Sequence, residues 1–138
     1  MKYHIYKLVL IITLFTITLY SQCVFAKTPE KTTPMNIAIN SRSNNLILGS
    51  GGKLTCSAST TVASGYKAVV IVELQQENKG WRTIKTWSDQ GGTLAKVNED
   101  WYVEKGYSYR LKLTHKALSS TGSEVESFLD YSKIVTYN

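Results

Sequence analysis

The sequence predicts an all-β protein, built as a single antiparallel β-sandwich of about seven strands, either immunoglobulin-like or fibronectin type III-like. Short strand-like runs recur roughly every 8–12 residues and are separated by turns rich in glycine, serine and asparagine. No stretch keeps the 3.6-residue apolar period and the capping residues of a helix. Both prolines, Pro29 and Pro34, precede these runs, so the strand region carries no residue that interrupts a sheet ladder.

The first predicted strands lie between residues 46 and 75. Residues 46–48 lead into a glycine-rich turn, and residues 53–62 alternate so that Leu54, Cys56 and Ala58 share one face. Residues 67–75 contain the most continuous apolar run after residue 26. This run is therefore the predicted central strand.

The later strands follow the same pattern. After a hairpin turn, strands are predicted at 81–87 and 93–103. A tight turn then precedes residues 107–115, in which Tyr109 shares one face with Leu111 and Leu113. Residues 124–137 form the last strand or strand pair.

A local pattern around residue 106 refines the fold prediction. Val103, Gly106 and Tyr109 place an apolar residue, a tight turn and a tyrosine before an alternating strand. This order resembles the tyrosine corner of immunoglobulin-like and fibronectin type III sandwiches, in which the tyrosine hydroxyl bonds back to the preceding turn. Immunoglobulin-type spacing would select Tyr107 instead. Because Cys56 has no partner to complete an immunoglobulin signature, the fibronectin-like form fits better.

Residues 1–26 predict a cleavable secretory signal peptide. Two lysines precede an apolar run, and Val24 and Ala26 form a small-x-small site for signal peptidase. The apolar run is about 13 residues long, whereas a membrane-spanning helix needs about 20. We therefore expect cleavage near Ala26–Lys27 and a secreted protein, extracellular or associated with the cell envelope, without an integral membrane segment.

The mature chain is predicted to hold one domain. Residues 27–45 are polar and are expected to form a flexible N-terminal segment, with at most one short strand at 36–39, before a sandwich domain at 46–138. Loss of the two leader lysines lowers the formal net charge from +6 to +4. The remaining lysines and arginines are scattered, so no nucleic-acid partner is expected.

Cys56 is the one cysteine left after cleavage, because Cys23 lies in the leader. The domain therefore has no internal disulfide. Its alternation with Leu54 and Ala58 predicts a buried, inert thiol in a monomer. A dimer linked through Cys56 is the alternative.

The sequence offers little to an enzyme. His115 is the one histidine of the mature chain, and it is expected to face inward as a structural residue, hydrogen-bonded to Glu124 across a hairpin. One histidine and one cysteine do not complete a usual zinc site. No nucleophile elbow or phosphate-binding glycine motif occurs. We therefore expect no catalytic residues, no metal and no cofactor.

The aromatic residues are the best candidates for a ligand surface. Strict alternation places Trp81, Lys85 and Trp87 on one face of a strand, and Trp101 belongs to a later strand. Flat aromatic rings beside polar groups stack on sugars or form protein hot spots. The alternative is that the tryptophans cover the edges of the core.

Taken together, the mature chain resembles a family of small secreted proteins of Gram-positive bacteria, known as a domain of unknown function. The resemblance rests on Gly80-Trp81-x-x-Ile84-x-x-Trp87-Ser88, on Val103-x-x-Gly106-Tyr107-x-Tyr109-Arg110, on His115-x-Ala117 and on Glu124, and it covers about residues 49–135. It implies an exported β-sandwich and brings no activity, cofactor or site.

The expected function is that of a secreted, non-catalytic β-sandwich module that binds an extracellular protein or glycan. A self-associating structural or matrix protein is the alternative from a different class. A small secreted enzyme or toxin is the third and weakest.

Overall fold

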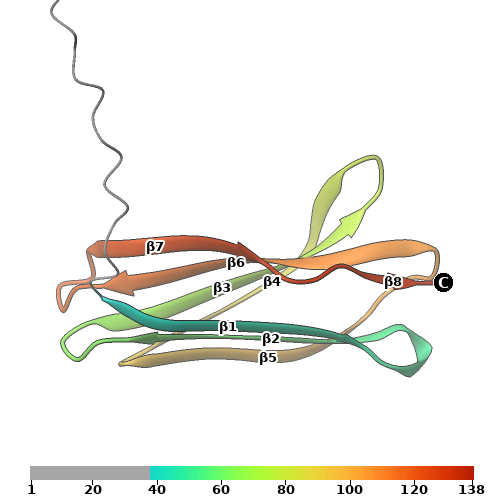
Figure 1. Cartoon of the computed structure of the whole chain (residues 1–138). Coiled ribbons are helices and arrows are strands. Elements are labelled where there is room, and N and C mark those ends of the chain that lie inside the picture. Colours follow the sequence, from blue (N-terminus) through green and yellow to red (C-terminus); the bar gives the residue numbers. More distant parts are fainter. Residues whose placement is uncertain (1–37) are drawn as a thin grey trace, which may run out of the picture. The chain divides into compact units, whose positions relative to one another are not determined.

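The chain forms two antiparallel sheets packed face to face, as a β-sandwich (Figure 1). The computed structural model describes residues 38–138. The predicted signal peptide and its cleavage site lie outside these residues. The elements are β1 (Ile39–Leu48), the short 3-10 helix η2 (Ser50–Gly52), β2 (Lys53–Val62), β3 (Lys67–Glu77), β4 (Trp81–Gly91), β5 (Leu94–Tyr102), β6 (Tyr107–Leu118), β7 (Glu124–Tyr131) and β8 (Val135–Tyr137).

The first sheet has the order β1-β2-β5, and the second has the order β4-β3-β6-β7, with β8 also paired to β6. β7 and β8 pair with successive parts of the same strand, β6. The last predicted segment, residues 124–137, is therefore a pair of strands, and the total is eight instead of about seven. The fourth strand pairs with β3 and not with the sheet of β1 and β2. In immunoglobulin constant domains, the fourth strand belongs to the sheet that contains the first two strands. The strand order found here is therefore that of the fibronectin type III-like alternative.

The core lies between the two sheets and follows the alternation of the sequence. β2, β3 and β6 each bury every second residue. Each fully buried leucine or valine contributes about 1.5–3 kcal/mol relative to leaving it in water. The apolar core consists of Ala38, Ile39, Leu46, Leu54, Cys56, Ala58, Val62, Ala68, Val70, Val72, Leu74, Ala95, Val97, Tyr109, Leu111, Leu113 and Ala117.

The predicted tyrosine corner is present, and Tyr109 forms it. The Tyr109 hydroxyl donates a hydrogen bond of 2.7 Å to the carbonyl oxygen of Glu104, in the turn before β6. Tyr109 is fully buried, whereas Tyr107 is only partly buried. Burial raises the pKa of Tyr109 above its ordinary value, so the phenol stays protonated and able to donate.

The sandwich starts earlier than predicted. β1 begins at Ile39. Part of residues 27–45, expected to form a flexible N-terminal segment, is therefore the first strand of the first sheet. Glu126 of β7 ties this start down, because its Oε2 accepts the backbone N–H groups of Ala38 and Ile39 at 3.0 and 2.8 Å. A predominantly polar strand is not visible to an apolar-period search, since its stability comes from these tertiary contacts.

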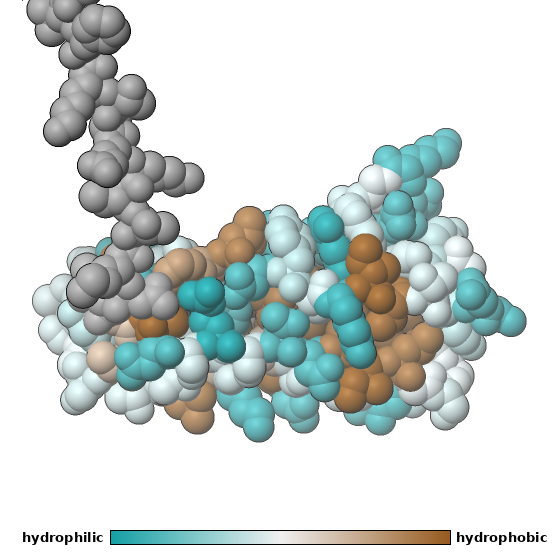
Figure 2. Space-filling view, in the orientation of Figure 1, coloured by the Kyte–Doolittle hydropathy of each residue, from teal (hydrophilic) through white to brown (hydrophobic). Residues whose placement is uncertain are grey.

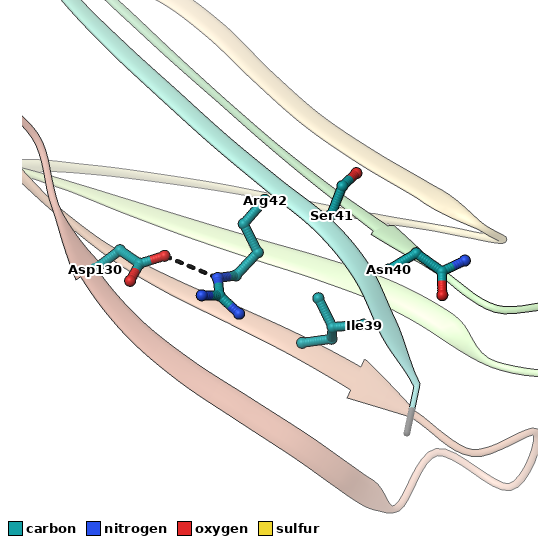
Figure 3. A pocket seen from close by; sticks show the side chains of 5 residues that line it. All are labelled: Ile39, Asn40, Ser41, Arg42 and Asp130. Carbon is teal, nitrogen blue, oxygen red and sulfur yellow. Dashed lines mark hydrogen bonds and ion pairs between the residues drawn. The ribbon is translucent and has the colours of Figure 1, made fainter. Parts of the chain in front are cut away.

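A second contact holds β1 to β7. The Arg42 Nε and the Asp130 Oδ2 lie 2.9 Å apart (Figure 3). The Arg42 guanidinium also covers the Phe128 ring, 4.0 Å from its centroid. The shallow hollow at this point is lined by Ile39, Asn40, Ser41, Arg42 and Asp130. Its cation and its carboxylate already neutralise each other, so this hollow belongs to the joint between the sheets.

Within residues 38–138, the structure contains no helix with the length and apolar character needed to cross a bilayer.

Candidate binding site at the edge of β4 and β5

A β-bulge in β4 decides where its aromatic residues point. Lys85 pairs with Leu74, but Thr83 pairs with Gln75, so Ile84 is an extra residue on the β4 side. A bulge of this kind reverses the alternation beyond it. Trp81 and Trp87 therefore lie on opposite faces of the sheet, and the expectation that they share one face is wrong.

Lys85 and Trp87 are directed toward the space between the sheets. Their cross-strand partners, Leu74 and Val72, are buried in the core, and directly paired residues share a face. On the other sheet, Trp101 of β5 pairs with the core residue Leu54. Because β4 and β5 are edge strands of different sheets, these side chains meet along one side of the sandwich.

At this edge Lys85, Trp87 and Trp101 form one cluster, which we call the tryptophan edge. The two indole rings meet edge to face, with centroids 6.2 Å apart and planes at 77°. The Lys85 Nζ lies 4.7 Å from the Trp101 centroid and 5.9 Å from the Trp87 centroid, within the range of a cation–π contact. Three of the four predicted surface residues are thus brought together.

Trp87 and Trp101 differ in exposure. Trp87 is partly buried and packs against the core, as the structural alternative predicted. Trp101 is 37% exposed, and its neighbour Tyr102 is 69% exposed. Trp87 therefore supports a ring whose other side is open to solvent.

Trp101 and Tyr102 line two neighbouring hollows. The larger measures about 400 Å³ and is lined by these two residues and Asp100. The other, of about 250 Å³, is lined by Gln76, Arg82, Ile84, Trp101, Tyr102, Val103, Glu104 and Tyr109. Both are shallow surface depressions, suited to a ligand that lies across the edge rather than one that is enclosed.

A chain of hydrogen bonds fixes the polar wall of the second hollow. The Arg82 Nε donates to the Gln76 Oε1 at 3.1 Å, and the Gln76 Nε2 donates to the Tyr109 hydroxyl at 3.1 Å. Tyr109 in turn donates to the Glu104 carbonyl oxygen at 2.7 Å. The tyrosine corner thus holds the site as well as the fold.

The charges around the hollows are unequally balanced. Asp100 is paired with Lys53 at 2.7 Å and accepts a hydrogen bond from Thr55, so the pKa of its carboxyl lies below its ordinary value. Among residues 38–138, Arg82 and Lys85 have no carboxylate within ion-pair distance. The Arg82 guanidinium instead contacts the neutral amide of Gln76, and the Lys85 ammonium contacts the two indole rings.

Trp81 takes part in a separate arrangement on the outer face of the larger sheet. The Arg110 guanidinium lies 4.1 Å from the Trp81 centroid and 4.4 Å from the Tyr131 centroid. The Arg110 Nε also donates to the Gln75 Oε1 at 2.9 Å. This stack immobilises Trp81 on its own sheet, away from the tryptophan edge.

His115 is fully buried, as its position in the alternation predicted, but its partner is not Glu124. Its Nδ1 lies 2.7 Å from the Thr60 Oγ1, and its Nε2 lies 3.7 Å from the Asp130 Oδ2. Glu124 instead pairs with Lys116 at 2.7 Å on the outer face. A bulge between Ala117 and Leu118 brings Glu124 opposite Leu118, so it does not share the inward face of His115.

Cys56 is also fully buried, and burial raises the pKa of its thiol to about 12. A disulfide between two chains through Cys56 would require the sandwich to open. Within residues 38–138, no three His, Cys, Asp or Glu side chains are grouped closely enough to hold a metal ion.

Sequence reasoning missed Arg82 and Gln76 as part of the site. The strict alternation expected for residues 81–87 would put Arg82 and Ile84 on the face opposite to Trp81 and Trp87. Gln75 and Gln76, two amides that end the apolar run of the central strand, are the signal that could have indicated a polar wall there.

Other exposed apolar residues do not form a comparable site. Ile47, Leu94, Val125, Leu129, Tyr131 and Ile134 are exposed on several different elements. Figure 2 shows the side on which β1 and β7 lie, mainly polar, with an apolar area toward β8. The tryptophan edge is distinguished by aromatic rings, unpaired cations and adjoining hollows together.

A scan against protein-family models finds no match, and searches of curated proteins and of solved structures find none either. The resemblance to the family of secreted Gram-positive proteins therefore stays a prediction from the residues that carry it.

Proposed function

We propose that this chain is a secreted, non-catalytic binding module that recognises an extracellular glycan or protein through the tryptophan edge and the neighbouring Tyr102. The observation that carries the proposal is the Trp101 ring. It is backed by Trp87, bears the Lys85 ammonium and lines two hollows. A rigid aromatic ring beside fixed polar groups is a common binding platform, because little side-chain entropy is lost on binding.

The export part of the proposal rests on the leader. Lysines, an apolar run and a small-x-small site occur in the order typical of a signal peptide. A module at the cell surface also has ready access to polysaccharides and to proteins of other cells.

The non-catalytic part rests on the surroundings of His115. Thr60, His115 and Asp130 lie in the order hydroxyl, imidazole and carboxylate. A nucleophile must be reached by its substrate, but Thr60 and His115 are both fully buried. The arrangement therefore serves the core.

The test is a binding screen with three single variants. Wild-type protein is assayed for co-sedimentation with cellulose, chitin and peptidoglycan, and on arrays of soluble polysaccharides and extracellular proteins. Trp101→Ala and Tyr102→Ala should weaken the best interaction at least about tenfold, since each removes a contact ring. Trp81→Ala is the matched control and should bind like wild type.

Circular dichroism and thermal melts must show that the variants are folded. The proposal fails if binding survives both edge substitutions, or if Trp81→Ala is the variant that abolishes it.

Self-association is the second candidate, and the outer face of β7 favours it. Val125, Leu129 and Tyr131 are 45%, 54% and 47% exposed on an edge strand of the larger sheet. Light scattering at rising protein concentration tests it, and Leu129→Lys should restore a monomer. A protein that stays monomeric throughout rules this candidate out.

A further inference from the structure

We infer that the ligand of the tryptophan edge is an acidic glycan, a polysaccharide whose sugar rings carry carboxylates. This inference rests on the proposed binding function and names the class of ligand. Two independent features lead to it: cations without carboxylate partners, and aromatic rings open to a flat ligand.

The first feature is the ion pairing of the lysines and arginines. Elsewhere in the described part of the chain, Arg42, Lys53, Lys112 and Lys116 each lie within 2.9 Å of a carboxylate oxygen. Lys85 and Arg82, on the same edge strand, have no such partner among the described residues. They differ from the other unpaired cations in their position, because Arg82 shares a hollow with Trp101 and Lys85 lies over the Trp101 ring. The other unpaired cations are Lys67, Lys79, Lys96, Lys105, Arg110 and Lys133. Lys85 faces two indole rings, and Arg82 uses its Nε on the neutral amide of Gln76.

Each of these cations is held in place but not neutralised. The cation–π contacts orient the Lys85 ammonium without cancelling its charge. Gln76 orients the guanidinium of Arg82, because its own Nε2 is anchored on Tyr109. Two prepositioned positive groups beside one ring favour an anionic ligand, since charge-assisted hydrogen bonds are the stronger kind.

The rings supply the second requirement. Trp101 is 37% exposed on the inner side of β5 and lines both hollows. Tyr102, the next residue, also lines both hollows, but its side chain leaves the strand on the opposite face, so a ligand would stack on the Trp101 ring and meet Tyr102 at the rim. A pyranose ring presents an apolar face of C–H groups, which can cover an aromatic ring while its hydroxyl and carboxylate groups stay at the rim. A simple polyanion without rings would use only half of the site.

One group opposes an anionic ligand and thereby provides a diagnostic. Glu104 lines the hollow together with Arg82, and it makes no ion pair among the described residues. The other nearby carboxylate, Asp100, is neutralised by Lys53. Removing the charge of Glu104 should therefore strengthen the binding of an acidic glycan.

The experiment compares three defined probes by isothermal titration and by tryptophan fluorescence. A hexauronate carries rings and charge, cellohexaose carries rings alone, and poly(glycerol phosphate) carries charge without rings. We expect wild-type protein to bind hexauronate at least about tenfold more tightly than either of the others. Raising NaCl from about 0.05 to about 0.5 M should weaken hexauronate binding and leave cellohexaose unchanged.

Charge variants supply the decisive signature. Lys85→Gln and Arg82→Gln should each weaken hexauronate binding several-fold, whereas Glu104→Gln should strengthen it, and cellohexaose binding should stay within about twofold throughout. Lys133→Gln, a change at an exposed lysine of the β7–β8 connection, is the matched control and should have no effect.

The outcomes separate this inference from the proposed function. Equal binding of cellohexaose and hexauronate, lost in Trp101→Ala, overturns the acidic glycan and keeps the binding site. Equal binding of poly(glycerol phosphate) overturns it as well, because the rings would then play no part. If no probe binds and the earlier screen also finds no ligand, the proposed function itself fails.

Discussion

The Thr60 hydroxyl oxygen and the His115 Nδ1 lie 2.7 Å apart, and their hydrogen bond joins the two sheets inside the core. Both residues are fully buried. The other ring nitrogen, Nε2, has no hydrogen-bond partner within residues 38–138 and lies 3.7 Å from the Asp130 Oδ2. Burying such a group costs free energy, so its protonation state bears on stability.

His115 should make the domain less stable in acid. Burial lowers the pKa of His115 below its ordinary value of 6.5, with a further lowering by Arg42 and an opposing effect of Asp130. The unfolded chain therefore binds a proton more readily than the native one, and stability contributed by the neutral imidazole is lost as pH falls below about 6.5. Urea unfolding at several pH values measures this loss.

The matched variant for that experiment is His115→Gln, whose amide can still bond to Thr60 but does not titrate. It should flatten the dependence of unfolding free energy on pH between about 7 and 5. An unchanged slope would show that His115 is not the source of the acid sensitivity.

Tyr109→Phe should destabilise the domain by about 1–3 kcal/mol. The substitution leaves the Glu104 carbonyl and the Gln76 amide without the hydroxyl that both contact. Tyr107→Phe is the control, because no hydrogen bond of the Tyr107 hydroxyl is found among the described residues, and it should cost less than about 0.5 kcal/mol. Equal losses in chemical denaturation would contradict the assignment of the corner to Tyr109.

The Cys56 thiol should not react in the native protein. Its pKa of about 12 and its full burial leave almost no accessible thiolate at neutral pH. Labelling with a chromogenic disulfide reagent should be complete within minutes in denaturant and negligible without it. Rapid native labelling, or a dimer on a non-reducing gel, would show that β2 opens.

Gly52→Ala should be far more damaging than Gly51→Ala. Both glycines have positive φ, +76° and +66°, so both substitutions carry backbone strain of about 1 kcal/mol. A Cβ on Gly52 would also lie 2.6 Å from the Val103 carbonyl oxygen and 2.7 Å from the Tyr137 ring, whereas Gly51 has open space. Thermal melts should show a clearly larger loss for Gly52→Ala, and similar losses would argue against this packing.

The strands were predictable because their pattern is local. The alternation in β2, β3 and β6 is written in consecutive residues, as is the turn that sets up Tyr109. The same alternation of inward and outward residues predicts that Cys56 and His115 are buried. β1 was not predictable in this way, because its exposed middle breaks the apolar alternation. Its start is held by Glu126 and its middle by the Arg42–Asp130 pair, which are contacts between distant segments.

The local pattern of residues is sufficient to predict the two-layer β architecture, a tyrosine corner formed by Tyr109 or Tyr107, and tryptophans able to form a surface. Contacts between distant segments, such as that of Gln76 with Tyr109, select Tyr109 as the corner residue and set which tryptophans act together. One inserted residue at Ile84 turns Trp81 to the outer face, while the meeting of two edge strands brings Trp101 to Lys85 and Trp87. Bulge position and edge pairing are set by packing across the sheets, so no local pattern of residues could reveal them.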